Sequence, residues 1–316
     1  MTYYLKYRSQ TIAELDIATV RETLTNIVKS GSIPHAFLFA GPKGTGKTSA
    51  ARILAKVINC ESSKEKPCNK CSQCISITNG TNIDVIEMDA ASNRGIDDVR
   101  ALRDIVKLAP ASAKAKIYII DEAHMLTIEA SNALLKTLEE PPSHVYFILA
   151  TTNPEKLIET IKSRTTFISF TKATDEEIFR SLKRVVKGEK IEITNDDLNK
   201  IIKIAKGSFR DAVKNLEQYS NDKSFLIKDL NINLEVFVEA LIKKDIKIIL
   251  ADLKKANNIH YLTSEILNIL HQKLVNSESL ELIPLIELIL KSNEMIKVSP
   301  IEKLPLEIAI IKWCNL

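Results

Sequence analysis

The 316-residue chain contains 45% hydrophobic and 27% charged residues, proportions typical of a globular protein with a substantial core. Its 44 basic and 40 acidic side chains give a formal net charge of +4, which is too small to identify a nucleic-acid-binding protein. Charged or amide side chains interrupt every apolar stretch and residues 1–10 contain no long apolar segment, so the composition excludes a membrane span and a secretion signal and favours a cytoplasmic protein.

Short apolar runs alternate with helical patterns through the first half of the chain. The runs predict buried strands, and the patterns between them predict helices that connect parallel strands. The predicted strands are 36–40, 84–88, 116–121, 145–150 and 167–170, and the predicted helices are 48–59, 96–107 and 128–139. This order indicates an α/β fold with a parallel five-stranded sheet that helices cover on both faces.

The pattern changes after Thr171, where apolar residues recur only at helical spacing. Thr174 is predicted to cap a helix whose first turn carries the three acidic residues 175–177. We therefore expect an α/β domain, a small helical domain and an all-helical C-terminal domain, with boundaries at 1–172, 173–222 and 223–316. The chain is predicted to end in an apolar helix, 306–313.

A complete phosphate-binding motif lies between the first predicted strand and the following helix. Its glycines allow backbone N–H groups to face phosphate oxygens, and the start of the helix adds positive potential. Lys47 is expected to contact the β- and γ-phosphates of ATP, and the Thr48 hydroxyl to bind Mg²⁺. An ordinary Gly-rich turn is the alternative, which the surrounding strand and helix disfavour. The predicted ATP-binding residues of this Walker A loop are Gly41, Pro42, Lys43, Gly44, Thr45, Gly46, Lys47, Thr48 and Ser49.

An acidic pair, Asp121 and Glu122, stands at the carboxyl end of the third predicted strand. Ligands bind at this edge in open parallel sheets. Asp121 is placed to bind Mg²⁺ together with Thr48, and Glu122 is placed to orient or deprotonate an attacking water. Alone, such a pair is as typical of a solvated helix start, but the upstream Walker A loop favours the catalytic interpretation. His124 is expected only to form a hydrogen bond in the same loop.

Four of the five cysteines form a cluster: Cys60, Cys68, Cys71 and Cys74. In a reducing compartment such a cluster binds metal more often than it forms disulfides. Four thiolates complete a tetrahedral shell around Zn²⁺, which predicts a structural zinc insertion at 60–74, too small for a core of its own. An iron–sulfur cluster is the alternative, although its motif places the fourth cysteine downstream rather than upstream. Cys314 is expected to be a small buried residue.

Several longer segments carry a family resemblance. They read Asp-Ala-Ala-Ser-Asn at 89–93, Ile-Ile-Asp-Glu-Ala-His-Met-Leu at 119–126, Asn-Ala-Leu-Leu-Lys-Thr-Leu-Glu-Glu-Pro-Pro at 132–142, Leu-Ala-Thr-Thr-Asn-Pro at 149–154 and Gly-Ser-Phe-Arg-Asp-Ala at 207–212. Together with the Walker A loop and the cysteine insertion, they resemble the gamma/tau subunits of the bacterial DNA polymerase III clamp loader, which are AAA+ ATPases. The resemblance extends from Tyr7 to about Tyr219 and is weaker beyond, although 299–307 looks like the family's closing collar segment.

The resemblance implies an AAA+ P-loop NTPase core with a zinc-binding insertion, a small helical lid and a C-terminal all-α collar that joins neighbouring subunits. It also implies that Arg164 is the finger that reaches an adjacent subunit's ATP, that Arg210 senses nucleotide from the lid, and that Thr152 is the sensor hydroxyl. Tyr7 and Arg8 match the family's adenine-side segment. An arginine supplied from a neighbour raises hydrolysis by about 10³–10⁵, but only in the assembled ring.

The same resemblance marks three residues as DNA-backbone contacts, since a helix start beside an arginine suits a phosphate: Asn93, Arg94 and Gly95. The chain departs from the family pattern in three places. Thr165 replaces the cysteine after the finger arginine, Ser9 replaces a proline, and Asp16-Ile17 replace a Gly-Gln pair, which alters the adenine-side segment. This sequence also ends at Leu316, without the long extension by which the tau form is thought to tether polymerase and helicase.

The resemblance implies an ATP-hydrolysing motor subunit that loads the sliding clamp onto primed DNA during replication. ATP binding lets the ring open the clamp, and primer–template DNA triggers hydrolysis and release. The implied cofactors are ATP, Mg²⁺ and Zn²⁺, and the implied partners are the other subunits of a hetero-oligomeric ring, the sliding clamp, primer–template DNA and the DNA polymerase III holoenzyme. No polymerase carboxylate constellation is recognisable, so we expect ATPase rather than polymerase chemistry.

Two other functions are compatible with parts of the sequence. The Asp-Glu-Ala-His segment at 121–124 prompts a helicase, but helicases of that type need a second nucleotide-binding lobe, and only helical segments follow Thr171. A non-catalytic architectural subunit, such as the related delta-prime protein, shares the zinc module. The complete Walker A loop with Lys47 disfavours it.

Overall fold

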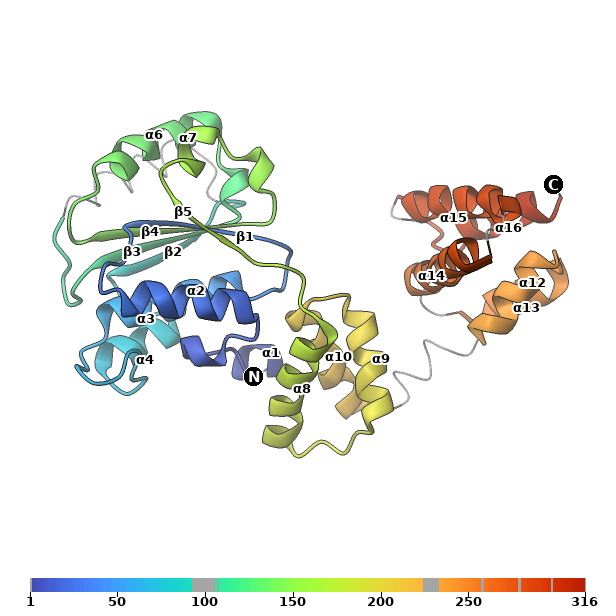
Figure 1. The fold of residues 1–316 in the computed structure, drawn as a ribbon, viewed down its shortest axis with the longest axis horizontal. Coiled ribbons are helices and arrows are strands. Elements are labelled where there is room, and N and C mark those ends of the chain that lie inside the picture. Colours follow the sequence, from blue (N-terminus) through green and yellow to red (C-terminus); the bar gives the residue numbers. More distant parts are fainter. Residues whose placement is uncertain are drawn as a thin grey trace. The chain divides into compact units, whose positions relative to one another are not determined.

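The computed structural model describes residues 2–92, 106, 108–223, 233–256, 259–277, 280–296 and 298–315 (Figure 1). The chain divides into two compact units, Met1–Glu217 and Gln218–Leu316. The predicted helix 96–107, apart from Val106, and the three implied DNA contacts at 93–95 lie outside the described residues.

One parallel sheet organises the first unit, with strand order β2-β3-β4-β1-β5. Its strands are β1 (Ala36–Ala40), β2 (Val85–Asp89), β3 (Lys116–Asp121), β4 (Val145–Thr151) and β5 (Thr166–Ser169). The predicted five-stranded parallel sheet is therefore confirmed, with ends that differ by one residue in β2, β4 and β5.

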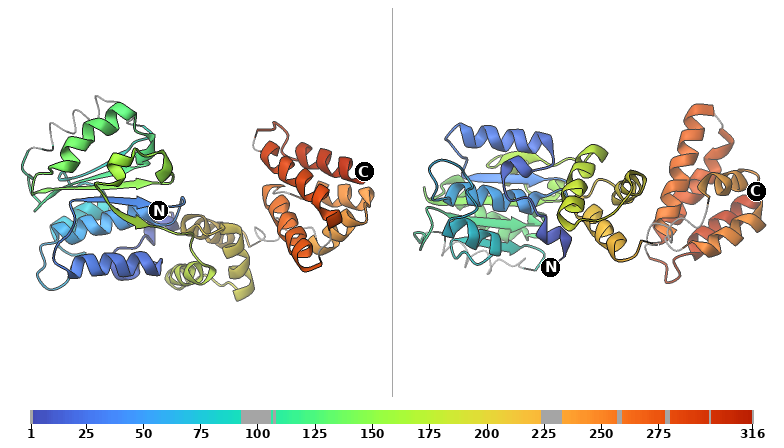
Figure 2. Two further views of the ribbon diagram at one scale, coloured as in Figure 1. Left: turned by 45° about the horizontal axis from the view of Figure 1, so that its top comes forward. Right: turned by 90° about the horizontal axis from the view of Figure 1, so that it is seen from below.

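Helices cover both faces of this sheet because side chains alternate along each strand (Figures 1 and 2). Phe37 and Phe39 pack with α2 (Ala18–Lys29) and α3 (Lys47–Asn59), whereas Leu38 packs on the opposite face with α6 (Ile128–Glu139) and α7 (Glu159–Lys162). Since β1 is buried along its whole length, polar groups are confined to the strand ends. The shorter elements of this region are α1 (Tyr3–Lys6), η1 (Ile12–Glu14), α4 (Ser72–Asn79), η2 (Ala123–Met125) and η3 (Pro154–Lys156).

Helices α8 (Asp175–Glu189), α9 (Asn195–Ala205) and α10 (Phe209–Asn221) follow the sheet and form the predicted lid. Thr174 caps α8 as predicted: its side chain accepts from Glu177 N, and the Glu177 side chain accepts from Thr174 N. The same Glu177 carboxylate accepts from Ala18 N at the start of α2, 3.1 Å away. A single side chain thus orders the starts of two helices.

Helices are the only regular elements among the described residues of the second unit. Its elements are α12 (Leu234–Ile242), α13 (Ile246–Lys255), α14 (Ile259–Ser277), η4 (Leu280–Leu282), α15 (Ile283–Ile296) and α16 (Leu304–Cys314). They share one apolar core, in which Trp313 Nε1 donates to Leu241 O at 2.7 Å. The predicted final helix lies within α16, while the domain boundaries at 172 and 222 stay predictions. None of the helices in the described part of the chain is long and apolar enough to cross a bilayer.

Replacing Thr174 with alanine is expected to lower the free energy of unfolding of the first unit by about 1 kcal/mol, because the first turn of α8 loses its cap. Chemical denaturation followed by circular dichroism measures the change. Thr171→Ala, at an exposed residue outside any helix, is the matched control. Equal stabilities of the two variants would contradict the capping role.

Candidate functional site

The Walker A loop joins β1 to α3 and folds around a buried lysine. Lys47 is only 6% exposed, and its Nζ donates to the carbonyl oxygens of Gly41 and Pro42 at 2.8 and 2.9 Å. Gly46, which precedes α3, has a φ of 98°, a left-handed conformation that glycine adopts without strain. The predicted loop geometry, with a lysine at the start of a helix, is therefore present.

Two further glycines are required by close neighbours. A Cβ on Gly41 would lie 1.9 Å from Phe170 O, and a Cβ on Gly44 would lie 2.1 Å from Ser208 Oγ. Gly44 O also accepts a hydrogen bond from Phe209 N at 3.0 Å. The loop thus packs against both the sheet edge and the lid. The Phe170 backbone blocks a side chain at Gly41, and the φ of 79° at Gly44 favours glycine there.

Thr48 and Asp121 meet across the site, as the sequence predicted for two Mg²⁺ ligands. The Thr48 hydroxyl donates to Asp121 Oδ2 at 2.7 Å. A hydroxyl and a carboxylate oxygen this close, beside a phosphate-binding loop, are the oxygen ligands that Mg²⁺ uses in nucleotide sites. The residues present therefore fit the ion.

Glu122 is held next to the strand β4 by Thr152. The Thr152 hydroxyl donates to Glu122 Oε2 at 2.9 Å, and Thr152 N lies 3.3 Å from the same oxygen. His124 Nδ1 lies 2.9 Å from Thr151 Oγ1 and 3.5 Å from Glu122 Oε2, so the histidine forms the loop hydrogen bond expected of it. These contacts fix one carboxylate oxygen and orient the group toward the loop.

A pocket extends from the Walker A loop to the N-terminal segment and the lid. It brings together residues that the sequence predicted from separate motifs: Tyr7, Arg8, Lys43, Gly44, Thr45, Gly46, Lys47, Thr48, Ser49, Asp121, Glu122 and Arg210. Gly41 and Pro42 do not line it but contribute the carbonyls that hold Lys47. Thr152 reaches it only through Glu122.

Positive charge is concentrated in this pocket. Burial lowers the pKa of Lys47, and Arg210 lowers it further, while Glu122 and Asp121 act in the opposite direction. Burial also lowers the pKa of Arg8, with Arg52 and Arg210 adding to the effect. Burial and neighbouring positive charges both destabilise the charged forms of Lys47 and Arg8. An anionic ligand such as a triphosphate stabilises these charged forms.

Arg164 lies outside this pocket, between α7 and β5. Its guanidinium pairs with Glu139 and donates to Thr160 O at 3.0 Å and to Ser163 Oγ at 3.3 Å. The side chains of Arg164 and Glu139 are 32% and 47% exposed, so water screens their attraction and the pair exchanges partners at low cost.

Seven of the residues that line the pocket were not predicted from the sequence. They come from the N-terminal segment and from lid helices, which lie far apart in the chain: Tyr4, Ser9, Leu15, Asp16, Ser181, Phe209 and Val213. The one sequence signal is Asp16, an acidic residue in an otherwise apolar Leu-Asp-Ile segment that breaks the family pattern.

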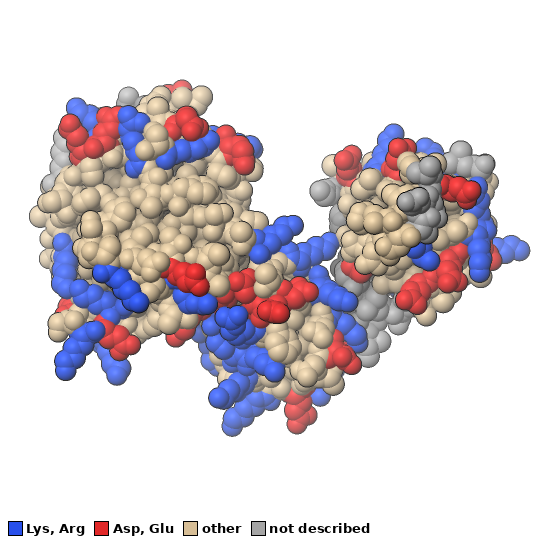
Figure 3. Space-filling model, viewed as in Figure 1, with Lys and Arg blue, Asp and Glu red and all other residues tan. Residues whose placement is uncertain are grey.

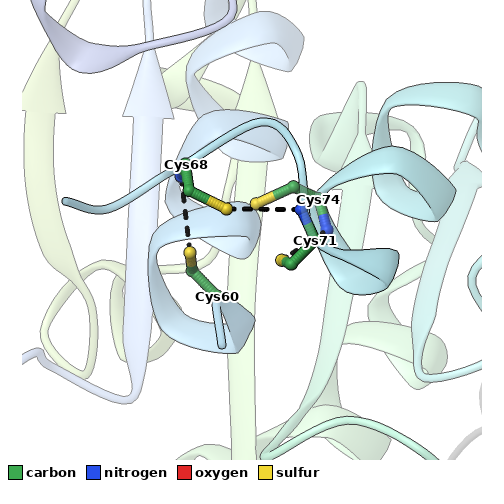
Figure 4. A group of neighbouring side chains, drawn as sticks. All are labelled: Cys60, Cys68, Cys71 and Cys74. Atoms are coloured by element: carbon green, nitrogen blue, oxygen red, sulfur yellow. Dashed lines mark hydrogen bonds between the residues drawn. The ribbon is translucent and has the colours of Figure 1, made fainter. Parts of the chain in front are cut away.

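The four clustered cysteines converge at the end of α3 (Figure 4). Their sulfur atoms all lie within 4.8 Å of one another, close to the roughly 3.8 Å separation that four Zn–S bonds of about 2.3 Å require. Cys60 and Cys74 are buried, and Cys68 and Cys71 are half-buried. The arrangement fits a closed tetrahedral metal site.

Backbone N–H groups prepare this cluster for thiolates. Those of Lys70 and Cys71 point at Cys68 Sγ, 3.5 and 3.3 Å away, and lower the pKa of that thiol to about 6. Burial raises the pKa of Cys74 to about 12. A bound cation favours the thiolate form of every ligand, and it would thereby offset the burial that keeps Cys74 protonated.

Comparisons with known proteins point to one family. A family model described as DNA polymerase III, delta subunit, matches residues 18–174. DNA polymerase III subunit tau of Bacillus subtilis is 50% identical over 200 residues, which are 63% of this chain and 36% of that protein. DNA polymerase III subunit gamma/tau of Mycoplasma genitalium is 40% identical over 262 residues, which are 78% of this chain and 43% of that protein. The matched part of the chain thus covers less than half the length of these relatives.

Solved structures support the fold independently. The RuvB Holliday junction branch migration motor of Thermotoga maritima matches with a TM-score of 0.51 at 18% identity, covering 78% of this chain and 85% of that chain. At such low identity the likeness concerns the fold alone, an AAA+ P-loop core followed by helices. The sequence identities above show that this chain belongs to the gamma/tau family of bacterial DNA polymerase III subunits.

Proposed function

We propose that the chain is an ATP-hydrolysing motor subunit of the DNA polymerase III clamp loader, which loads the sliding clamp onto primed DNA. One observation carries the proposal: in a gamma/tau family member, a complete Walker A loop lies against an acidic pair and beneath a lid arginine. Hydrogen bonds of 2.7 Å between Thr48 and Asp121 and of 2.9 Å between Thr152 and Glu122 join groups that act together in phosphoryl transfer.

The proposed reaction is in-line attack of water on the γ-phosphate of ATP. Loop N–H groups and Lys47 bind the triphosphate, and Glu122, oriented by Thr152, positions or deprotonates the water. Mg²⁺, held by Thr48 and Asp121, supplies neutralising charge at the phosphate oxygens. Arg210 adds positive charge from the lid. A bound nucleotide would therefore contact both the sheet domain and the lid of the first unit.

The position of Arg164 supports a role toward a neighbouring subunit. It does not line the pocket of its own chain, and it precedes the edge strand β5, in which Phe167 is 56% exposed. Figure 3 shows that a broad face of the first unit, between the α6–α7 side and the α2 side, carries few charged side chains. A charge-poor face and an exposed aromatic residue in an edge strand are both typical of protein interfaces.

The proposed partners follow from the family. They are the other subunits of a hetero-oligomeric ring, the sliding clamp, primer–template DNA and the DNA polymerase III holoenzyme, acting in the cytoplasm. The match covers only 36% and 43% of the relatives from Bacillus subtilis and Mycoplasma genitalium, so their full activities enter here only as part of the proposal.

We also propose that the cysteine cluster binds Zn²⁺ and has a structural role. Four thiolates leave no coordination position open for a substrate. The insertion holds α4 against the end of α3, and Cys71 caps α4 by accepting from Cys74 N. The metal therefore stabilises a segment that lacks an apolar core of its own.

The matching family model is named after a delta subunit, so a non-hydrolysing architectural role is the second candidate function. The complete Walker A motif argues against that role, since an architectural subunit does not require Lys47 and the acidic pair. Measurable nucleotide turnover separates the two functions.

ATP turnover by the reconstituted loader is expected to rise when primed DNA and the clamp are both added, because these partners complete the active ring. A complex containing Lys47→Ala is expected to lose turnover by about a hundredfold or more, since the main side-chain contact to the phosphates is gone. Phosphate release measures both effects. Turnover that does not change when DNA and clamp are added would indicate a generic ATPase. Full activity of the Lys47→Ala complex would contradict the proposed ATP site.

Arg164→Ala is expected to leave ATP binding intact but to reduce hydrolysis by the assembled ring by about 10³–10⁵, as for other arginines supplied from a neighbour. Nucleotide binding to the isolated chain and single-turnover hydrolysis by the complex measure the two properties separately. Lys162→Ala, which removes a nearby half-exposed cation that pairs with Glu159, is the matched control. A variant ring that hydrolyses ATP like the control contradicts the assignment.

Purified protein is expected to contain about one zinc per chain, and Cys71→Ser is expected to lower this content and the unfolding temperature of the first unit. Elemental analysis and calorimetry provide the two readouts. Cys314→Ser, in α16 of the second unit, is the control that leaves zinc unchanged. Iron in place of zinc, or full zinc content in Cys71→Ser, would show that the cluster is a different centre.

A further inference from the structure

The pocket is lined by the N-terminal segment and the lid as well as by the Walker A loop, and this inference about that lining rests on the proposed function. If the loop and Lys47 hold the triphosphate, the remaining lining receives the base. That lining combines apolar, aromatic and hydroxyl side chains with a single carboxylate, and it includes Tyr4, Tyr7, Leu15, Asp16, Ser181 and Val213. The environment suits a purine ring, and Asp16 supplies the one charged acceptor among these residues.

Only half of the Asp16 carboxylate is committed within the protein. Asp16 is 9% exposed, and its Oδ2 accepts from Arg184 Nη2 at 2.6 Å. Its Oδ1 is buried and has no hydrogen-bond partner among the described residues. Burial raises the pKa of Asp16, while Arg184 and Ser181 act in the opposite direction. An unpaired buried acceptor costs free energy that a donor in the pocket recovers.

Arginine side chains already use the backbone acceptors beside Asp16. Glu14 O accepts from Arg184 Nη1 at 3.1 Å, and Leu15 O accepts from Arg21 Nη1 at 2.7 Å. These contacts fix the segment 14–16 from both sides. They hold the Asp16 side chain in place, with its buried Oδ1 unpaired among the described residues.

We propose that Asp16 selects adenine by accepting a hydrogen bond from the exocyclic 6-amino group. Guanine carries a carbonyl oxygen at the corresponding position, which would face the carboxylate as a second acceptor. A site that bonds a donor in this way discriminates strongly against an analogue that lacks it. Asp16 is therefore a specificity-determining residue of the ATP site.

The test compares binding of ATP, GTP and purine riboside triphosphate, which is ATP without its 6-amino group, to the full chain by calorimetry. The wild-type chain is expected to bind ATP about 10- to 100-fold more tightly than either analogue, the effect of one hydrogen bond to a charged group. This comparison requires no variant.

In Asp16→Asn, Arg184 can only donate, so the amide oxygen is expected to face Arg184 and the amide nitrogen to take the place of Oδ1. The preference for ATP over purine riboside triphosphate should then disappear, and GTP should gain affinity relative to ATP. Asp175→Asn makes the same chemical change at an exposed position of α8 and should keep the wild-type preference.

Equal binding of ATP and purine riboside triphosphate by the wild-type chain overturns the assignment alone. So does an Asp16→Asn variant that weakens all three nucleotides by the same factor, because that pattern indicates a purely structural residue. Failure of the wild-type chain to bind any of the three overturns both the assignment and the proposed function.

Discussion

The parallel register of β1, β4 and β3 is the constraint on which the nucleotide site depends. Ala40 at the end of β1 pairs with Thr151 of β4, and Gly41 N then donates to Thr151 O at 3.1 Å. Asp121 ends β3 on the other side of β4. Because the strands run in one direction, the Walker A loop, the acidic pair and Thr152 leave the sheet at the same edge. An antiparallel neighbour would send its polar end to the opposite edge.

Helix α3 connects this edge with the cysteine cluster, and a buried ammonium group secures the connection. Lys56 is 1% exposed, and its Nζ donates to Gln10 O, Gln10 Oε1 and Asn69 Oδ1 at 2.8, 2.7 and 2.8 Å. Burial lowers the pKa of Lys56, whereas Cys74 raises it. Glu14 also raises this pKa, although no carboxylate accepts a hydrogen bond from Lys56 Nζ. Four thiolates around the proposed Zn²⁺ would leave about two net negative charges, which would offset the buried cation further. The same ammonium ties the insertion to the N-terminal wall of the nucleotide pocket.

Local patterns predict the parts of the site that contiguous residues form. Strands buried on both faces are unbroken apolar runs, and the Walker A loop requires glycines at fixed positions, so both can be identified from one sequence. The part of the pocket formed by the N-terminal segment and the lid is different. The contact between Asp16 and Arg184 arises from packing between segments far apart in the chain, which no periodicity of the sequence predicts. The pairing of Arg164 with Glu139 is likewise tertiary. Even the proposed role of Arg164 comes from family resemblance rather than from its local sequence.

The contact between the Walker A loop and the lid couples the conformations of these two parts of the nucleotide site. Phe209 N, at the start of α10, donates to Gly44 O, and Gly44 has a φ of 79° in a position where a Cβ would meet Ser208 Oγ. The shape of the Walker A loop and the position of α10 therefore depend on each other. A nucleotide that contacts the loop, the N-terminal segment and Arg210 binds with a free energy that changes as the lid moves. By linkage, the lid position then responds to the nucleotide, and this differential affinity is what the proposed motor function requires.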